Sequence, residues 1–297
     1  MTDDNDKKII YTGPSPRGWH RLQQAAECLQ KYAWKYEAPE EEGAKDELAK
    51  SPALIKGSLV HLALAQHYAR MRAEQTEGDS ADAWCTPKEA VELIAELEGN
   101  TGYIDNVLQT FDAYAQRYNV KAEQQTMRIL AVEELFDSKI AGKYRLTGRA
   151  DLIYEDMGGR VFVVDHKTTS RITNKHKQYY GISGQLIGYA HMAREVYGDR
   201  FSGMVLNLIQ HGPNPKFERL TLPRSPFLEQ NFEQTVVDLE ESIERLQTEG
   251  RPYDQWPKAM NELTCFHRYG ACQFVDQCRF GAGYKAGGNF DFGKFNN

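Results

Sequence analysis

Two segments in the middle of the chain alternate between apolar and polar residues in the way that β-strands do. Residues 143–156 and 160–168 are rich in β-branched and aromatic side chains, and Met157-Gly-Gly159 between them is typical of a hairpin turn. The sequence therefore predicts two antiparallel neighbouring strands. The apolar run Val161 to Val164 indicates that the second strand is buried on both faces.

The rest of the pattern predicts helices before and after this hairpin, and two further strands. Such an order is typical of a mixed central β-sheet flanked by helices, an α/β (α+β) fold. With 297 residues, 41% of them hydrophobic, the chain can bury the core of one domain. We expect helices at 18–36, 53–73, 87–97, 103–119, 178–197 and 226–247, strands within 127–168 and at 202–210 and 217–222, loose or polar connections at 1–15 and 38–50, and a flexible tail at 281–297. Within a single domain over 1–297, these elements divide into an N-terminal helical part (16–126), a sheet-bearing core (127–222) and a C-terminal part (223–280).

Charged residues gather at the ends of the two hairpin strands. Side chains alternate along a strand, so Asp165 and Lys167 should share one face, His166 should point away, and Asp151 can face them from the neighbouring strand. Carboxylate oxygens suit Mg²⁺ or Mn²⁺, and an ammonium group beside them can orient a water or stabilise charge on a phosphate. The alternative is an exposed hairpin with scattered charges. The end of a buried strand is a poor place for unpaired charges, which favours a functional site.

Cysteines provide the second signal. Three of the five, Cys265, Cys272 and Cys278, lie near the C-terminal end, Cys28 lies far upstream, and Cys85 is the expected unliganded thiol. We find neither a signal peptide nor an apolar run near the ~20 residues of a membrane span, so we expect a cytoplasmic protein without a membrane anchor. Clustered thiols there bind metal more often than they form disulfides. The spacing alone leaves zinc and a [4Fe–4S] cluster open.

A net charge of −6 excludes DNA binding through a uniformly basic surface, so any contact with nucleic acid must be local. The candidate segment runs from His166 to Tyr180 and carries cations without any acidic residue. Its cations can meet phosphates and its tyrosines can stack on unpaired bases, although a solvated loop is the simpler alternative. The candidate contacts are Arg171, Lys175, Lys177 and Tyr180.

The pattern Gly148-x-x-Asp151 followed by Asp165-x-Lys167 resembles the PD-(D/E)XK nuclease superfamily, in its RecB-like branch. Three further motifs extend the resemblance: Gly57-Ser-Leu-Val-His61, Val132-Glu133-x-x-Phe136 and Gln185-Leu-Ile-Gly-Tyr189. Each has a plainer interpretation, because His61 lies in an apolar helix, Glu134 competes with Glu133, and residues four apart share a helix face in any helix.

The resemblance implies a restriction-endonuclease-like core and a role for each motif residue. Asp151, Asp165 and His61, with the His166 carbonyl, would hold Mg²⁺ or Mn²⁺. Glu133 and Lys167 would take part in catalysis, Gln185 would brace the lysine, and Tyr189 or Tyr180 would position a nucleotide.

One cysteine before the core and three after it is similar to the iron–sulfur exonucleases of the AddB type and of CRISPR adaptation. The resemblance implies a [4Fe–4S] cluster on Cys28, Cys265, Cys272 and Cys278 that joins the first helix to the last segment. The usual tighter Cys-x2-Cys step is missing here.

The implied function is a metal-dependent deoxyribonuclease, an exonuclease that acts on DNA ends or single strands in recombination or replication, in a bacterium or bacteriophage. Recombination or replication proteins and further copies of the chain are the expected partners. The alternatives are a nuclease-like iron–sulfur subunit that binds DNA for assembly, and a zinc-stabilised scaffold.

Overall fold

The computed structural model describes residues 7–39, 51–222, 225–267 and 270–281. Most of the predicted connection at 38–50 and of the tail at 281–297 lies outside these residues. No helix among the described residues is both long and apolar enough to cross a membrane.

The chain forms two compact units, each made of two separate stretches of sequence. The first unit comprises Met1–Trp19 and Ala49–Gln234, and the second comprises His20–Leu48 and Thr235–Asn297. The expectation that 1–297 behaves as one domain stays a prediction.

A five-stranded mixed sheet forms the centre of the first unit, as the sequence predicted. Its strands are β1 (Met127–Ile140), β2 (Tyr144–Asp156), β3 (Val161–Thr169), β4 (Phe201–Gln210) and β5 (Lys216–Leu222), and they lie in this order. Only β3 and β4 pair in parallel; the other neighbours are antiparallel. The predicted hairpin of β2 and β3 is therefore confirmed.

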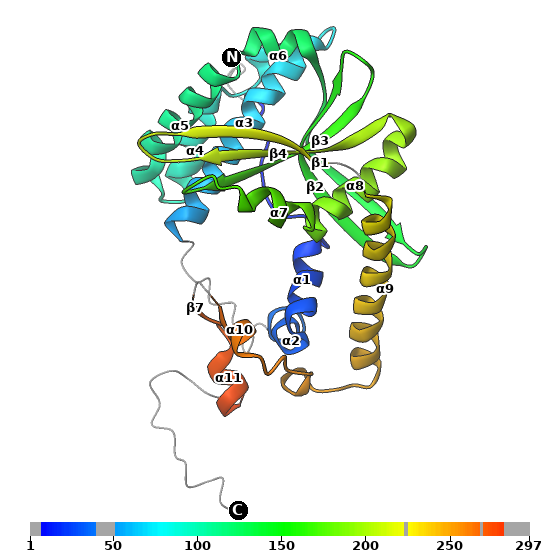
Figure 1. Cartoon of the computed structure of the whole chain (residues 1–297). Helices are drawn as coiled ribbons and strands as arrows, with labels where there is room; N and C mark the ends of the chain where they lie inside the picture. Colours follow the sequence, from blue (N-terminus) through cyan, green and yellow to red (C-terminus); the bar gives the residue numbers. More distant parts are fainter. Residues whose placement is uncertain (1–6, 40–50, 223–224, 268–269, 282–297) are drawn as a thin grey trace, which may run out of the picture. The chain divides into compact units, whose positions relative to one another are not determined.

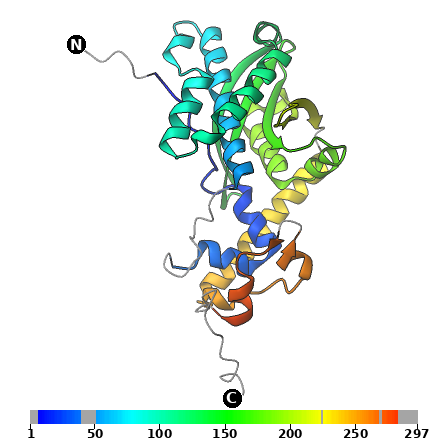
Figure 2. The same cartoon turned by 90° about the vertical axis from the view of Figure 1, so that its left-hand side faces the viewer.

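Helices cover both faces of this sheet (Figures 1 and 2). One face carries α3 (Pro52–Gln75), α4 (Pro87–Leu97) and α5 (Ile104–Arg117), whose apolar residues pack with Val132, Leu152 and Val164. The other face carries α8 (Gly184–Tyr197), which packs on Ala150, Val163 and Leu206. In Figure 2 the cyan and teal helices lie on one side of the green strands, and the lime helix α8 lies on the other.

The predicted helices α3, α4, α5 and α9 (Pro226–Thr248) and the predicted strands β4 and β5 are confirmed. Thr86 and Glu89 form a capping box at the start of α4. The sequence did not predict the short helix α6 (Val120–Thr126), which begins with Asn119 as its cap. Single turns of 3-10 helix complete the elements: η1 (Ala81–Ala83), η2 (Thr101–Tyr103), η3 (Gly198–Arg200) and η4 (Tyr253–Gln255).

Two predicted helices are each divided into two. The helix expected at 18–36 consists of α1 (Trp19–Glu27) and α2 (Leu29–Tyr36), because Cys28 between them has an extended backbone. The helix expected at 178–197 consists of α7 (Lys175–Gly181) and α8. The Trp19 ring occupies the place of a side chain at Gly184, where a Cβ would come within 2.2 Å of it, so the start of α8 is set by tertiary packing.

Aromatic stacking organises the second unit. Trp34 of α2 stacks on Phe274, and Tyr32 stacks on Trp256, with ring centroids 6.2 Å and 5.9 Å apart. Its other elements follow the long helix α9: α10 (Glu262–Cys265), β6 (Phe266–His267), β7 (Gly270–Ala271) and α11 (Val275–Phe280).

Candidate active site

The candidate site lies where strands β2 and β3 separate. Their paired residues run from Glu155 and Val161 to Leu152 and Val164, and Asp151 and Asp165 come next. At this point the backbone N–H of His166 donates to Asp151 Oδ2 at 2.5 Å. A carboxylate thus replaces the backbone acceptor of a regular ladder. The N–H and C=O of one residue point to the same side of a strand, so the His166 carbonyl also faces this opening.

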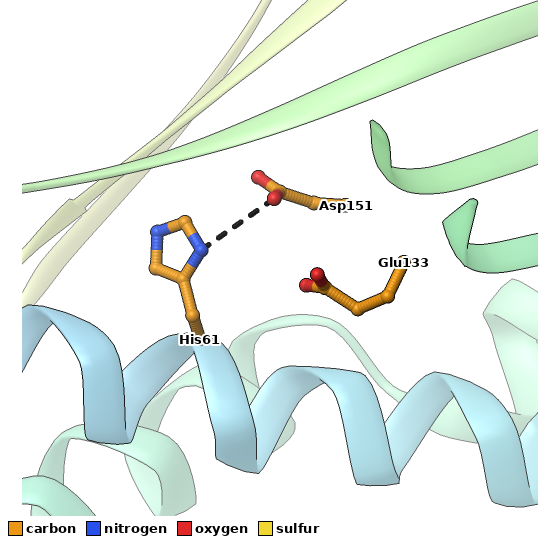
Figure 3. Close-up of side chains that lie close together, drawn as sticks. All are labelled: His61, Glu133 and Asp151. Carbon is orange, nitrogen blue, oxygen red and sulfur yellow. Dashed lines mark ion pairs between the residues drawn. The ribbon is translucent and has the colours of Figure 1, made fainter. Parts of the chain in front are cut away.

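Three potential metal ligands converge beside the opening. His61 of α3, Glu133 of β1 and Asp151 of β2 each bring one ligand atom within 4.8 Å of the others (Figure 3). His61 Nδ1 lies 3.6 Å from Asp151 Oδ1. One imidazole and two carboxylates fit a divalent cation such as Mn²⁺ or Mg²⁺.

An unusual backbone conformation directs Glu133 into this group. Val132 pairs with Leu152 and Glu134 pairs with Ala150, so Glu133 lies opposite Asp151. Its φ of 52° is in the left-handed region, which a residue with a side chain rarely adopts. Glu134 is exposed, so Glu133 rather than Glu134 reaches the site.

Mutual electrostatics determine the protonation of these three groups. Burial and the neighbouring Asp151 raise the pKa of Glu133 to about 8. Burial opposes ionisation of Asp151, but His61 holds its pKa well below the ordinary value, and Asp151 in turn raises the pKa of His61 against the effect of burial. The group therefore holds protons near neutral pH that a divalent cation would displace.

Half-buried Lys167 forms an ion pair with buried Asp165 on the face covered by α8. Lys167 Nζ lies 3.0 Å from Asp165 Oδ1 and 2.9 Å from Oδ2. It also donates to Gln185 Oε1 at 3.0 Å, and Gln185 Nε2 donates to the Tyr189 hydroxyl at 3.0 Å. Burial would lower the pKa of Lys167, but Asp165 and Asp151 raise it. The expectation that Asp165 and Lys167 share a face is confirmed.

Asp165 is not among the three side chains whose ligand atoms lie within 4.8 Å of one another, so its expected role as a ligand beside Asp151 and His61 stays a prediction. Asp165 is only 2% exposed and needs a counter-charge, which Lys167 supplies.

Two motif glycines allow helices to approach the site closely. A Cβ on Gly148 would lie 2.5 Å from Met192 Cε and 2.6 Å from Tyr189 Cε1, both on α8. A Cβ on Gly57 would lie 2.9 Å from Thr168 Oγ1, at the end of β3. One turn after Gly57, the same helix carries His61.

A family model described as the PD-(D/E)XK nuclease superfamily matches residues 19–279. The chain belongs to this superfamily. The matched region includes every motif of the site, from Gly57 to Tyr189, and extends through Cys278.

Among solved structures, this PD-(D/E)XK protein is similar to a "Putative exonuclease" from Eubacterium rectale, with 13% identity and a TM-score of 0.40 over 69% of this chain and 76% of the other. It is also similar to SSO0001, with 17% identity and a TM-score of 0.29 over 64% of this chain and 84% of the other. No curated protein matches the chain.

Behind the nuclease motifs lies a buried polar chain that the sequence analysis missed. Asn207 Nδ2 lies 2.9 Å from His166 Nδ1 and donates to the Tyr114 hydroxyl at 2.9 Å. Arg219 donates to the same hydroxyl at 2.7 Å and pairs with Glu123 at 2.5 Å. Burial lowers the pKa of His166 to about 3, so its ring is neutral. In the sequence, the only sign of this polar chain was Asn207, an amide within the otherwise apolar strand β4.

The predicted DNA-contacting residues lie between β3 and α8. Arg171 and Lys175 are exposed, and Tyr180 is half-buried with its ring 5.1 Å from that of Tyr179. Lys177 lies within α7, but its side chain lies outside the described part of the structure.

Four half-buried thiols lie in the second unit. Cys28 separates α1 from α2, Cys265 ends α10, Cys272 follows β7, and Cys278 lies in α11. The backbone N–H of Cys272 donates to the carbonyl of Cys265 at 2.7 Å. Burial raises the pKa of Cys278, and the nearby Cys28 and Cys272 raise it further. Cys85 is buried in the first unit, and all five described cysteines are free thiols.

Proposed function

We propose that this PD-(D/E)XK nuclease is a metal-dependent deoxyribonuclease that hydrolyses phosphodiester bonds at DNA ends or in single strands. The observation that carries the proposal is the convergence of His61, Glu133 and Asp151 beside the Lys167–Asp165 pair. A protein that only binds DNA does not need three potential metal ligands beside a lysine–aspartate pair.

The donor set fits a resident Mg²⁺ or Mn²⁺. His61, Glu133 and Asp151 would hold it, with the His166 carbonyl on the same opening, and Asp165 is a further candidate ligand. When bound, such an ion supplies an activated water and stabilises charge on the phosphate.

The residues on the α8 face prepare an ammonium group for the reaction. Asp165 and Gln185 hold Lys167 from two sides, each at about 3.0 Å, so its charge is fixed before substrate binds. A preorganised charge can orient the attacking water and stabilise the negative charge that develops on phosphorus oxygens. Tyr189 is 8% exposed and accepts the Gln185 hydrogen bond, so we assign it to supporting Gln185.

Local positive charge provides the contact with DNA. Arg171, Lys175 and Lys177 follow the catalytic strand in a chain whose net charge is −6, so phosphate contacts concentrate here. Tyr180, in the same segment, offers a ring to an unpaired base. We infer a setting in recombination or replication from the family resemblance.

We further propose a [4Fe–4S] cluster on Cys28, Cys265, Cys272 and Cys278. All four thiols belong to one unit and come from separate elements. Four thiolates that bind one zinc, each at about 2.3 Å, have shorter sulfur–sulfur distances than four thiolates that each bind a different iron of a cluster.

An assay of end-labelled DNA tests the nuclease. Single- and double-stranded substrates would be incubated with Mg²⁺, Mn²⁺ or chelator, and products read by length over time. We expect stepwise shortening from an end with either cation and none with chelator. Lys167→Ala should abolish cleavage and leave DNA binding intact, whereas Lys139→Ala, an exposed lysine on β1, should change neither. Wild-type cleavage by Lys167→Ala would remove the lysine from the mechanism.

A further inference from the structure

A pocket opens in the first unit on the sheet face that carries α8. It lies between α7, α8, the paired ends of β4 and β5, and the start of α9, and it is open to solvent on one side. Most lining side chains are apolar, and Ser225 and Glu229 are the polar exceptions. Its walls include Tyr180, Ile187, Ala190, Met204, Leu222 and Leu228.

The pocket adjoins the catalytic lysine. Tyr180 lines it and also lies within electrostatic reach of Lys167. Leu186, another lining residue, is next in sequence to Gln185, which binds Lys167 at 3.0 Å. On the sheet, Met204 of β4 pairs with Val163 of β3. Val163 lies two residues before Asp165, which is about 7 Å along β3. A DNA strand with one phosphate at the candidate active site can therefore place a neighbouring base in the pocket.

Three large apolar side chains that are next in sequence to lining residues are exposed to solvent. Tyr179, Ile182 and Phe227 are 65%, 72% and 72% exposed. Arg171 and Lys175, on the same segment as Tyr180, add positive charge. Stacking surfaces beside cations are the combination that recognises unpaired nucleic acid.

We propose that this pocket receives an unpaired nucleobase adjacent to the phosphodiester that is cut, with the Tyr180 ring as its stacking surface. The inference rests on the proposed nuclease function and specifies its substrate: a strand end whose base is free of its complement. A base held in a duplex cannot enter without losing its pair and its stack, which costs a few kcal/mol. The enzyme should therefore prefer single strands or frayed ends.

A scan with abasic sites tests the pocket. Single-stranded oligonucleotides would each lack one base at successive positions from the end, and single-turnover cleavage would be measured with Mg²⁺ or Mn²⁺. Since stacking of a base on an aromatic ring contributes about 1–3 kcal/mol, we expect a loss of about 5- to 100-fold at one position next to the cleaved bond. Other positions should change little.

Variants separate the pocket from its surroundings. Ile187→Trp, which fills the pocket, should slow cleavage of the intact strand and remove the difference between intact and abasic substrates. Leu97→Trp adds the same side chain at an exposed position of α4 and should behave as wild type. Leu228→Trp enters the pocket from α9 and provides a second filling variant if the first does not fold.

The outcomes distinguish this inference from the proposed function. If the enzyme cleaves DNA but every abasic substrate is cut at the same rate, the proposed base pocket is wrong and the proposed nuclease function stands. The same holds if a protein partner occupies the pocket. If no DNA is cut, oligonucleotides with 2-aminopurine at each position would be bound in chelator. Quenching at one position that Tyr180→Ala removes would support the pocket, and unchanged fluorescence at every position would overturn it.

Discussion

Glu133 shows how a single residue combines strain with function. Its backbone is left-handed within a β-strand, its side chain is 8% exposed, and its carboxyl group lies beside another carboxylate. Backbone conformations of this kind cost of order 1–3 kcal/mol and occur at functional sites, where the surrounding structure maintains them. If Glu133 is the third ligand of the proposed metal site, the protein gives up stability here to place it.

Glu133→Gln should make the metal-free protein more stable and the enzyme inactive. A folded-state pKa of about 8 against an ordinary value of 4.5 means that, in chelator, the folded state loses stability as pH rises from 4.5 to 8. At pH 7 this loss is on the order of 3 kcal/mol, which glutamine avoids. Denaturant unfolding in chelator at pH 5 and pH 7 measures it, and we expect cleavage to fall by about 100-fold.

Glu134→Gln is the matched control, because Glu134 is the exposed neighbour on the same strand. It should change neither stability nor cleavage. Equal losses of activity in the two variants would contradict the assignment of Glu133 to the site.

We expect His67 to make the free energy of unfolding depend on pH in the acid range. It lies in α3 against Tyr68 and Phe111, and burial lowers its pKa to about 4 from an ordinary 6.5. Its contribution is fully present above pH 6.5 and is lost as pH falls toward 4, because only the unfolded state takes up the proton there. The total is about 3 kcal/mol. His67→Phe should reduce the change in the free energy of unfolding between pH 7 and pH 5. If the variant shows the same change as the wild type, His67 takes up its proton in the folded state as readily as in the unfolded state.

At the scale of elements, the site depends on how closely two helices approach the sheet. His61 of α3 contacts Asp151 of β2, and Gln185 of α8 binds Lys167. The buried chain from Arg219 through Asn207 holds His166 from the α3 side. The central strand β3 is thus supported on both faces, which keeps Asp165 and Lys167 in place.

Gly148→Ala should separate α8 from β2. The new Cβ would meet Met192 and Tyr189 at 2.5 Å and 2.6 Å, and moving Tyr189 disturbs the hydrogen bonds that hold Lys167. Overpacking of this size costs about 1–3 kcal/mol. We expect cleavage to fall by more than the loss of folded protein explains, measured as single-turnover rate against the unfolding midpoint.

Gly102→Ala provides the comparison, because nothing lies within 4 Å of a Cβ at that position. It should retain wild-type cleavage. A fully active Gly148→Ala variant would show that the contact between Tyr189 and Gln185 does not matter for the reaction.

At the scale of the whole molecule, two units carry different chemistry. The candidate oxygen and nitrogen ligands for a hard cation belong to the first unit, and Cys28, Cys265, Cys272 and Cys278 belong to the second. Soft thiolates select iron–sulfur clusters, and carboxylates select Mg²⁺ or Mn²⁺. If both proposed sites exist, each should be emptied without loss of the other.

Anaerobically purified protein should absorb broadly at roughly 400 nm. Cys28→Ser and Cys272→Ser should remove this absorbance and lower the unfolding temperature, since a bound group stabilises the folded state. Cys85→Ser should keep it, because Cys85 lies in the other unit. A chelator of Mg²⁺ should stop cleavage without removing the absorbance at roughly 400 nm. A colourless protein with one zinc per chain would reject the cluster.

Local patterns in the sequence were sufficient for much of the fold. The hairpin of β2 and β3 follows from alternating residues on either side of Gly158 and Gly159, and the start of α4 follows from its capping box. Such signals depend on neighbours in sequence, so they predict elements and the face on which Asp165 and Lys167 lie. The family motifs, likewise short, pointed to the residues that the structure brings together.

The tertiary structure alone decided which of these residues meet. Glu133 joins His61 and Asp151, because the backbone of β1 is left-handed at Glu133, opposite the point where β2 and β3 separate. The break before Gly184, the buried chain behind His166 and the pocket beside Tyr180 have the same origin. Each arises from packing between segments far apart in the chain, which no local pattern of residues encodes.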